Sequence, residues 1–304
     1  MDLSFFKKTR ILDAGMGQEL LARGLITKGT LWSATSLIDE KFNSLVVDTH
    51  LSSINAGADV ILTNTFTTRR VRMVQNQVGD LFQFANQKAC ELAIKARELS
   101  KKNILIAGSL PAQNDTYQAD KRDQNIIEKD FFDQASIINP YIDFFYLDVI
   151  SSGREVEVAL NAIDKLNKPV LVGLHLKKNG MLPSGETITE IVKKYKNTKW
   201  LGVVSACVSL EIVEQTVDEL KSLDIPFGFK ANLWAVEEPL PVHRFNTAGY
   251  NEIGKNPNIT LGKREITGKV FCQFAKKISK KGATILGGCC ETDSSHIKEL
   301  FKLK

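Results

Sequence analysis

The sequence lacks the long apolar runs of a membrane protein. No stretch of its 304 residues reaches the roughly 18 consecutive apolar residues that a membrane-spanning helix needs. The first ten residues, MDLSFFKKTR, contain no apolar run of signal-peptide length. The five cysteines are an odd number, which speaks against a disulfide framework. We therefore expect a cytoplasmic protein, because clustered cysteines in a reducing compartment more often bind metal or take part in catalysis.

The chain also lacks a large excess of positive or negative charge. The 40 lysines and arginines stand against 35 aspartates and glutamates, and the formal net charge is only +5. The basic residues are scattered and form no stripe interleaved with aromatic residues, so we expect neither nucleic acid nor a membrane as a partner. Hydrophobic residues make up 43% of the chain and charged residues 25%, which is enough for a large core and argues against disorder.

Short apolar runs alternate along the chain with longer segments that have helical spacing. Such runs are too apolar to face water, which is typical of a parallel sheet covered by helices. Eight of them in a chain of this length predict an α/β fold, a single-domain (β/α)8 barrel over residues 1–304. A doubly wound sheet is less favoured, because no G-x-G-x-x-G motif follows the first run. The eight runs are Arg10–Asp13, Ala58–Thr65, Asn103–Ser109, Ile142–Asp148, Pro169–Leu176, Trp200–Cys207, Pro226–Asn232 and Ala283–Gly288.

Residues 233–263 interrupt this regular alternation. The segment follows the seventh apolar run, is long and polar, and contains prolines. We expect a long loop or insertion there. The sequence leaves open whether it is a lid, an arm for self-association into a homo-oligomer, or a surface loop.

Three cysteines end apolar runs of the predicted barrel. Cys207 ends the sixth run, and Cys289 and Cys290 end the eighth. A barrel places its chemistry at the carboxyl ends of its strands, where these thiols could converge. Zinc prefers thiolate ligands, and three protein ligands with one open position are typical of catalytic zinc. The alternative is that they are small core residues, and for Cys90 and Cys272, which lie in helix-like segments, this alternative is favoured.

Two aspartates also end predicted strands, Asp13 the first and Asp148 the fourth. Carboxylates there would bind the ammonium group of an amino acid by charge-assisted hydrogen bonds. Helix caps or structural ion pairs are the alternative, and for Asp148 the two readings are nearly equal. Trp32 and Trp234 lie in connecting segments where an aromatic wall could face a methylated cation. His175 ends the fifth run and is a ligand or a structural histidine.

Several segments resemble those of homocysteine S-methyltransferases, in order over nearly the whole chain. They are Ile11–Gly17, Arg23-Gly24, Leu31–Ala34, His50, Ala56–Asp59, Thr63–Phe66, Ala107–Ser109 and Gly287–Cys290 with Thr292 and His296-Ile297. The resemblance implies a zinc-bearing barrel that methylates homocysteine to methionine. It implies Cys207, Cys289 and Cys290 as zinc ligands, and a substrate site made by Asp13, Gly15, Met16, Thr65 and Asp148.

The chain departs from the family pattern in the predicted substrate shell. The family usually has Asn at the position of Ala206, and Glu at the position of Asp148. It usually has Gly where this chain has Ala14, and a small residue where this chain has Glu291. These changes leave the predicted zinc site intact and leave a variant specificity open.

The methyl donor is less well defined than the thiol acceptor. No folate- or cobalamin-binding module is evident before Lys304, which favours a small onium donor such as betaine, S-methylmethionine or dimethylsulfoniopropionate. The segment Thr65–Thr68 lacks the tyrosine of betaine-type members and is slightly more similar to the cobalamin-dependent type. A homocysteine-activating subunit that works with a separate corrinoid protein is therefore an alternative. A non-catalytic zinc barrel with a binding role is another, and a metal-dependent hydrolase, with His175 or Glu291 as base, is the weakest.

Overall fold

Eight parallel strands form the frame of the structure, a computed structural model that describes residues 3–304. Their order is β1-β8-β7-β6-β5-β4-β3-β2, and a bridge between Leu12 and Val60 closes the sheet between β1 and β2. The predicted (β/α)8 barrel is confirmed. The strands are β1 Arg10–Ile11, β2 Val60–Leu62, β3 Leu105–Pro111, β4 Phe144–Ile150, β5 Val170–Leu174, β6 Trp200–Ala206, β7 Phe227–Ala231 and β8 Ile285–Gly288.

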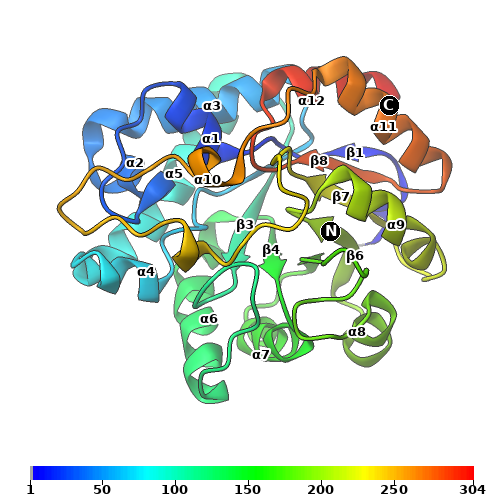
Figure 1. The fold of residues 1–304 in the computed structure, drawn as a ribbon, viewed down its shortest axis with the longest axis horizontal. Helices are drawn as coiled ribbons and strands as arrows, with labels where there is room; N and C mark the ends of the chain where they lie inside the picture. Colours follow the sequence, from blue (N-terminus) through cyan, green and yellow to red (C-terminus); the bar gives the residue numbers. More distant parts are fainter. Residues whose placement is uncertain (1–2) are drawn as a thin grey trace.

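Helices surround the barrel on the outside (Figure 1). The longer ones are α1 Met16–Ala22, α3 Asn43–Ala56, α5 Phe82–Ser100, α6 Gln124–Ile138, α7 Gly153–Asp164, α8 Ile188–Tyr195, α9 Leu210–Lys221, α11 Gly268–Lys280 and α12 Ser294–Leu300. Short helices are α2 Thr35–Ile38, α4 Arg70–Gln75 and α10 Asn258–Leu261, and 3-10 turns are η1 Leu3–Lys7, η2 Trp32–Ala34, η3 Glu40–Phe42, η4 Gly79–Leu81, η5 Asn139–Tyr141, η6 Val242–Arg244 and η7 Phe301–Leu303. Within residues 3–304, no helix is long and apolar enough to cross a membrane.

Local sequence explains where these helices begin and which face they bury. The Ser152 side chain accepts a hydrogen bond from the Glu155 backbone at the start of α7, and Val156, Ala159 and Ile163 then recur every three or four residues and are buried. At the start of α8, Thr187 and Glu190 form a reciprocal capping box. Each helix is thus fixed at its first turn and held by one apolar stripe against the sheet.

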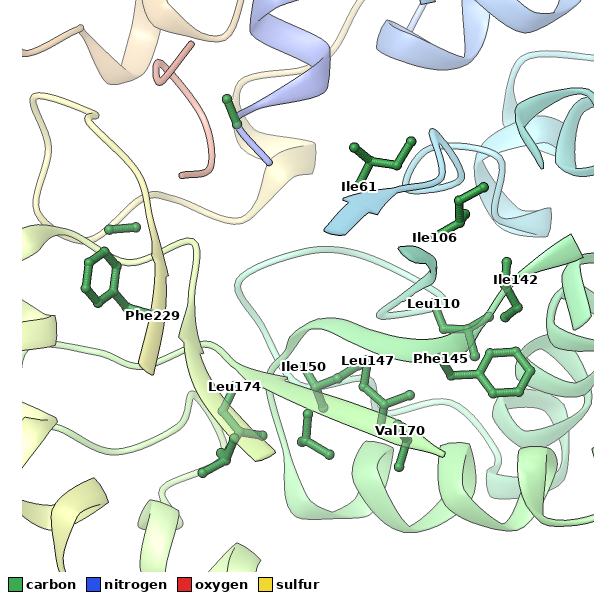
Figure 2. Close-up of a cluster of buried hydrophobic side chains, with 14 of the residues drawn as sticks. Ile61, Ile106, Leu110, Ile142, Phe145, Leu147, Ile150, Val170, Leu174 and Phe229 are labelled. Atoms are coloured by element: carbon green, nitrogen blue, oxygen red, sulfur yellow. The ribbon is translucent and has the colours of Figure 1, made fainter. Parts of the chain in front are cut away.

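The core has two main layers. One fills the inside of the barrel, where Phe6 of η1 packs edge-on against Phe144, with ring centroids 5.9 Å apart. The other lies between the strands and the helices. Figure 2 shows part of it, including Ile106, Phe145 and Leu147. The carboxyl ends of the strands are left free for a site.

Strand ends differ from their predicted positions by a few residues. The largest consequence concerns Asp148, which was expected to end the fourth strand but lies inside β4, because this strand continues to Ile150. The register of β4 against β5 shifts between Leu147 and Ile150. Val149 lies in this irregularity at a φ of 61°, a left-handed conformation that is strained for a β-branched residue.

Residues 233–263 form a long connection that we call the β7–α11 segment. It contains η6 and α10 and is anchored by bridges between Trp234 and Lys263 and between Lys28 and Ile253. In Figure 1 it runs, in yellow and orange, from β7 across the barrel toward α2 and α4 and returns through α10. The segment is therefore placed to contribute to the mouth of the barrel.

Candidate metal and substrate site

Three thiols meet at the carboxyl ends of β6 and β8. Cys207 directly follows β6, and Cys289 and Cys290 directly follow β8. The Cys207 and Cys290 sulfurs are 3.8 Å apart, those of Cys289 and Cys290 are 4.0 Å apart, and all three lie within 4.8 Å of one another. Among residues 3–304, this is the group of His, Cys, Asp or Glu side chains with the spacing of metal ligands. The structure thus brings the three predicted cysteines together.

The backbone around the thiols is held in a tight arrangement. Cys207 has a φ of 51° and Glu291 a φ of 64°, so the chain turns through the left-handed region on both sides of the group. The Cys289 amide donates to the Ala231 carbonyl of β7 at 2.7 Å, and the Thr292 hydroxyl donates to the Cys289 carbonyl at 2.7 Å. A Cβ on Gly15 would lie 2.2 Å from the Cys289 carbonyl oxygen. Only glycine allows the loop after β1 to pack this closely.

The charges of the three thiols are linked. Burial raises the pKa of the Cys207 thiol, but hydrogen bonds from Cys289, Cys290, Tyr117 and Asn232 outweigh burial and lower this pKa well below its ordinary value. The hydrogen bond to Cys207 in turn raises the pKa of Cys289 to about 12. Without a metal ion, the three thiols together can therefore carry little negative charge. Three converging soft donors are the chemistry that suits a thiophilic divalent cation such as zinc.

A cavity of about 950 Å³, including the part open to solvent, extends from the thiols. Five aromatic side chains line it: Trp32, Phe66, Tyr117, Trp234 and Phe245. They also pack with the three cysteines in one cluster, and the Tyr117 hydroxyl lies 3.2 Å from the Cys207 sulfur. The prediction that Trp32 and Trp234 lie near the barrel mouth agrees with this placement. Tyr117 and Phe245 had no signal in the sequence, because both come from irregular segments.

Asp13 lines this cavity and faces a buried lysine. Its Oδ2 accepts a hydrogen bond from the Leu62 amide at 2.8 Å, whereas Oδ1 lies 3.2 Å from Lys230 Nζ and has no hydrogen bond of good geometry within the described chain. Lys230 Nζ also donates to the Gly288 carbonyl at 2.6 Å. Burial lowers the pKa of Lys230, but the Asp13 charge outweighs burial and raises it. The pair thus places one carboxylate oxygen and one ammonium group beside the thiols.

Sequence reasoning missed Lys230, although a signal was present. It is the one charged residue inside the apolar run Pro226–Asn232. In the sheet it lies opposite Ala206 of β6 and Gly287 of β8, which places it between the two strands that carry the cysteines.

Asp148 lines the same cavity. Its Oδ2 accepts a hydrogen bond from the Ser109 hydroxyl at 2.8 Å. Burial raises the pKa of Asp148 to about 7. Gly15 and Met16 line the cavity too, so four of the five predicted substrate residues lie on one surface.

Thr65 does not lie on this surface. It is fully buried and absent from the cavity lining, and its hydroxyl donates to the Ser109 carbonyl at 2.6 Å. The expectation of a substrate contact at Thr65 is therefore not met by the geometry. The side chain instead ties the end of β2 to β3.

The remaining candidates lie outside the thiol group. His175 is buried with Nδ1 3.4 Å from the Ala206 carbonyl, and burial lowers its pKa to about 4. Glu291 is held by Gln18 and lies 3.7 Å from Lys263. Cys90 is buried in α5, and Cys272 donates to the Glu299 carbonyl in α12. These placements agree with a structural role for the last two cysteines.

Known proteins are similar to this chain over almost its whole length. The family model described as homocysteine S-methyltransferase matches residues 10–303. Homocysteine S-methyltransferase 2 of Saccharomyces cerevisiae is 23% identical, with 97% of this chain and 93% of the relative covered. Betaine–homocysteine S-methyltransferase 1 of Danio rerio is 26% identical, with 94% and 70% covered.

The fold is also that of a solved structure. The metallated form of the homocysteine methyltransferase MmuM from Escherichia coli superposes with a TM-score of 0.77, at 18% identity, over 98% of this chain and 96% of the other. The oxidised form gives the same TM-score at 20% identity, over 97% and 96%. At such identities the likeness shows the barrel fold.

Proposed function

Because the chain belongs to the homocysteine S-methyltransferase family, we propose that it is a zinc-dependent enzyme that methylates homocysteine to methionine with a small onium donor. The observation that carries the proposal is the meeting of three thiols in a cavity walled by aromatic side chains. The thiols would hold the zinc that activates the methyl acceptor, and the aromatic side chains would bind the methyl donor.

Cys207, Cys289 and Cys290 would hold the zinc. Structural zinc sites use four protein ligands, whereas catalytic sites use three and leave one position open. When bound, zinc makes a coordinating thiol give up its proton at neutral pH, so that it becomes a nucleophile. In support, no histidine, aspartate, glutamate or further cysteine among residues 3–304 joins the three sulfurs at ligand spacing.

Asp13 and Asp148 would bind the amino group of homocysteine. The Asp13 Oδ1 atom is ion-paired with Lys230 but accepts no hydrogen bond within the described residues, so it could accept one from a substrate ammonium. Gly15 and Met16, which line the cavity at the start of α1, would lie beside the substrate backbone. Thr65 would act only by fixing the loop after β2.

The aromatic side chains would hold the donor. An onium group has no hydrogen to donate, and the faces of Trp32 and Trp234 can stabilise it by cation–π attraction. In the transfer, a sulfur lone pair of homocysteine forms the S–CH3 bond. The electron pair of the breaking C–N⁺ or C–S⁺ bond goes to the leaving heteroatom, which becomes neutral. The barrel contributes orientation of the two reactants and exclusion of water.

The β7–α11 segment would complete the site within a single barrel domain. Val242, Phe245, Asn246 and Pro257 of this segment line the cavity. We therefore assign the segment to the cavity wall. The five cysteines are free, which fits a place in the cytoplasm.

The test is a donor panel with the purified protein. Zinc-loaded enzyme is incubated with homocysteine and betaine, S-methylmethionine, dimethylsulfoniopropionate or methylcobalamin, and methionine is measured by mass spectrometry. We expect methionine with at least one onium donor and its loss in Cys289→Ser, with Cys272→Ser as the matched control. Methionine from methylcobalamin alone would favour the corrinoid-dependent alternative, and none from any donor would contradict the proposal.

A further inference from the structure

Two arginines lie buried on the wall of the cavity without a carboxylate partner. Arg69 precedes α4 and Arg72 lies in its first turn, and their exposed fractions are 1% and 5%. Neither forms an ion pair with any described residue, 3–304. Arg70, between them in sequence, is different. It points to α6 and pairs with Asp133 at 2.7 Å.

The hydrogen bonds of the two buried guanidinium groups are incomplete. Arg69 Nη1 donates to the Ala112 carbonyl at 2.6 Å and to Thr116 Oγ1 at 3.2 Å, but its Nε has no partner. The Arg72 guanidinium makes no hydrogen bond to the described part of the chain. Two neighbouring buried cations with open donors are costly unless something else neutralises them.

The nearest acidic group is already engaged. Asp115 acts electrostatically on both arginines but lies beyond ion-pair distance of either. Its Oδ2 lies 2.5 Å from His243 Nδ1 and also accepts from the Gln118 amide, and its Oδ1 accepts from the Thr116 amide. Burial lowers the pKa of Arg69 to about 9, and burial likewise lowers the pKa of Arg72. The positive charges of Arg69 and Arg72 are therefore not neutralised by an ion pair, which favours the binding of an anion from outside the chain.

The position of Arg72 indicates where such an anion would lie. Arg72 and Asn246 line both the inner cavity with the thiols and an adjoining outer cavity of about 1030 Å³. The outer cavity is lined mainly by polar residues, among them Gln75, Asn114 and Gln118. A ligand that enters through the outer cavity meets Arg72 first and then the inner cavity, which Arg69, the aromatic side chains and the thiols line.

We propose that Arg72, with Arg69 beside it, binds the carboxylate of the methyl donor. The planar fork of arginine matches a carboxylate, and the donor would lie with its carboxylate at the arginines and its onium group against the aromatic side chains. This inference rests on the proposed function and narrows the donor to a zwitterion with a carboxylate. After transfer the product keeps that carboxylate and loses its positive charge, so it loses the cation–π part of its binding and leaves.

The experiment compares donors with and without a carboxylate in the variants Arg72→Gln and Arg70→Gln. The probes are dimethylsulfoniopropionate, glycine betaine, trimethylsulfonium and tetramethylammonium, with KM and kcat for each. A hydrogen bond to a charged group contributes about 1.5–3 kcal/mol, so Arg72→Gln should raise the KM of carboxylated donors about 10- to 150-fold. The KM values of trimethylsulfonium and homocysteine should not change, and Arg70→Gln should change none. Thermal unfolding of Arg72→Gln should show no loss of stability, because the arginine has no internal partner.

Equal losses for donors with and without the carboxylate would overturn the inference, as would a rise confined to the KM of homocysteine. If the wild type makes no methionine from any donor, the proposed function fails, and equilibrium titration with glycine betaine and dimethylsulfoniopropionate tests the arginines alone. Binding that is lost in Arg72→Gln and kept in Arg70→Gln would still support the anion site. No binding by the wild type would refute it.

Discussion

Replacement of Lys230 by methionine removes the ammonium group that is paired with Asp13. The two side chains are almost fully buried and their charged atoms are 3.2 Å apart. Removal of one partner of a buried ion pair leaves the other charge uncompensated and costs about 3–5 kcal/mol. Asp13 keeps its hydrogen bond from the Leu62 amide, and the Gly288 carbonyl loses its donor. We expect Lys230→Met to lower the free energy of unfolding by about 3–5 kcal/mol.

Urea unfolding of metal-free protein, followed by circular dichroism, gives this free energy. The double variant Lys230→Met/Asp13→Asn should regain a large part of the loss, because no charge is then left unpaired. Lys277→Met is the matched surface control: its partner is the exposed Glu214, and its effect should be within about 1 kcal/mol. A Lys230→Met protein as stable as the wild type, or a double variant no more stable than the single one, would refute the reasoning.

Two further predictions concern stability against pH and the packing beside the thiols. Burial raises the pKa of Glu155 from 4.5 to about 7, so the stability tied to its protonated form is complete below about pH 4.5 and is lost as the pH rises through 7. Glu155→Gln should remove this decline, on the order of 3 kcal/mol, in unfolding free energies measured from pH 5 to 8, and an unchanged slope would contradict the assignment. Gly15→Ala should displace Cys289 and weaken zinc retention in a chelator competition. Gly249→Ala, whose added Cβ would come no closer than 3.5 Å to another atom, should leave zinc retention unchanged. Equal zinc retention in both variants would contradict the proposed close packing of Gly15 against Cys289.

The barrel and the thiol group could be predicted because both depend on local patterns. Each buried strand is a short apolar run, and Cys207 and Cys289 directly follow two of these runs. The end of β4 could not be predicted, because it depends on the irregular pairing around Val149 with β5. Asp148 is therefore inside its strand and still reaches the cavity.

The pairing of charges in the cavity could not be predicted from the sequence, although Lys230 itself stands out in its apolar run. Lys230 matters because β1 brings Asp13 to it, 217 positions away in the chain (230 minus 13). Arg72 has the same helical setting as many surface arginines, yet it is buried and lines the same two cavities as Asn246 of the distant β7–α11 segment. Such pairings follow from the tertiary fold and from no local pattern.

Zinc K-edge X-ray absorption, with and without homocysteine, tests the central claim most directly. We expect about one zinc per chain with three sulfur neighbours, from Cys207, Cys289 and Cys290, at about 2.3 Å. Addition of homocysteine should raise the count to four sulfurs, and Cys289→Ser should lose the metal. A zinc with four protein ligands, or a sulfur count that homocysteine does not change, would show that the three cysteines do not form an open site for the substrate thiol.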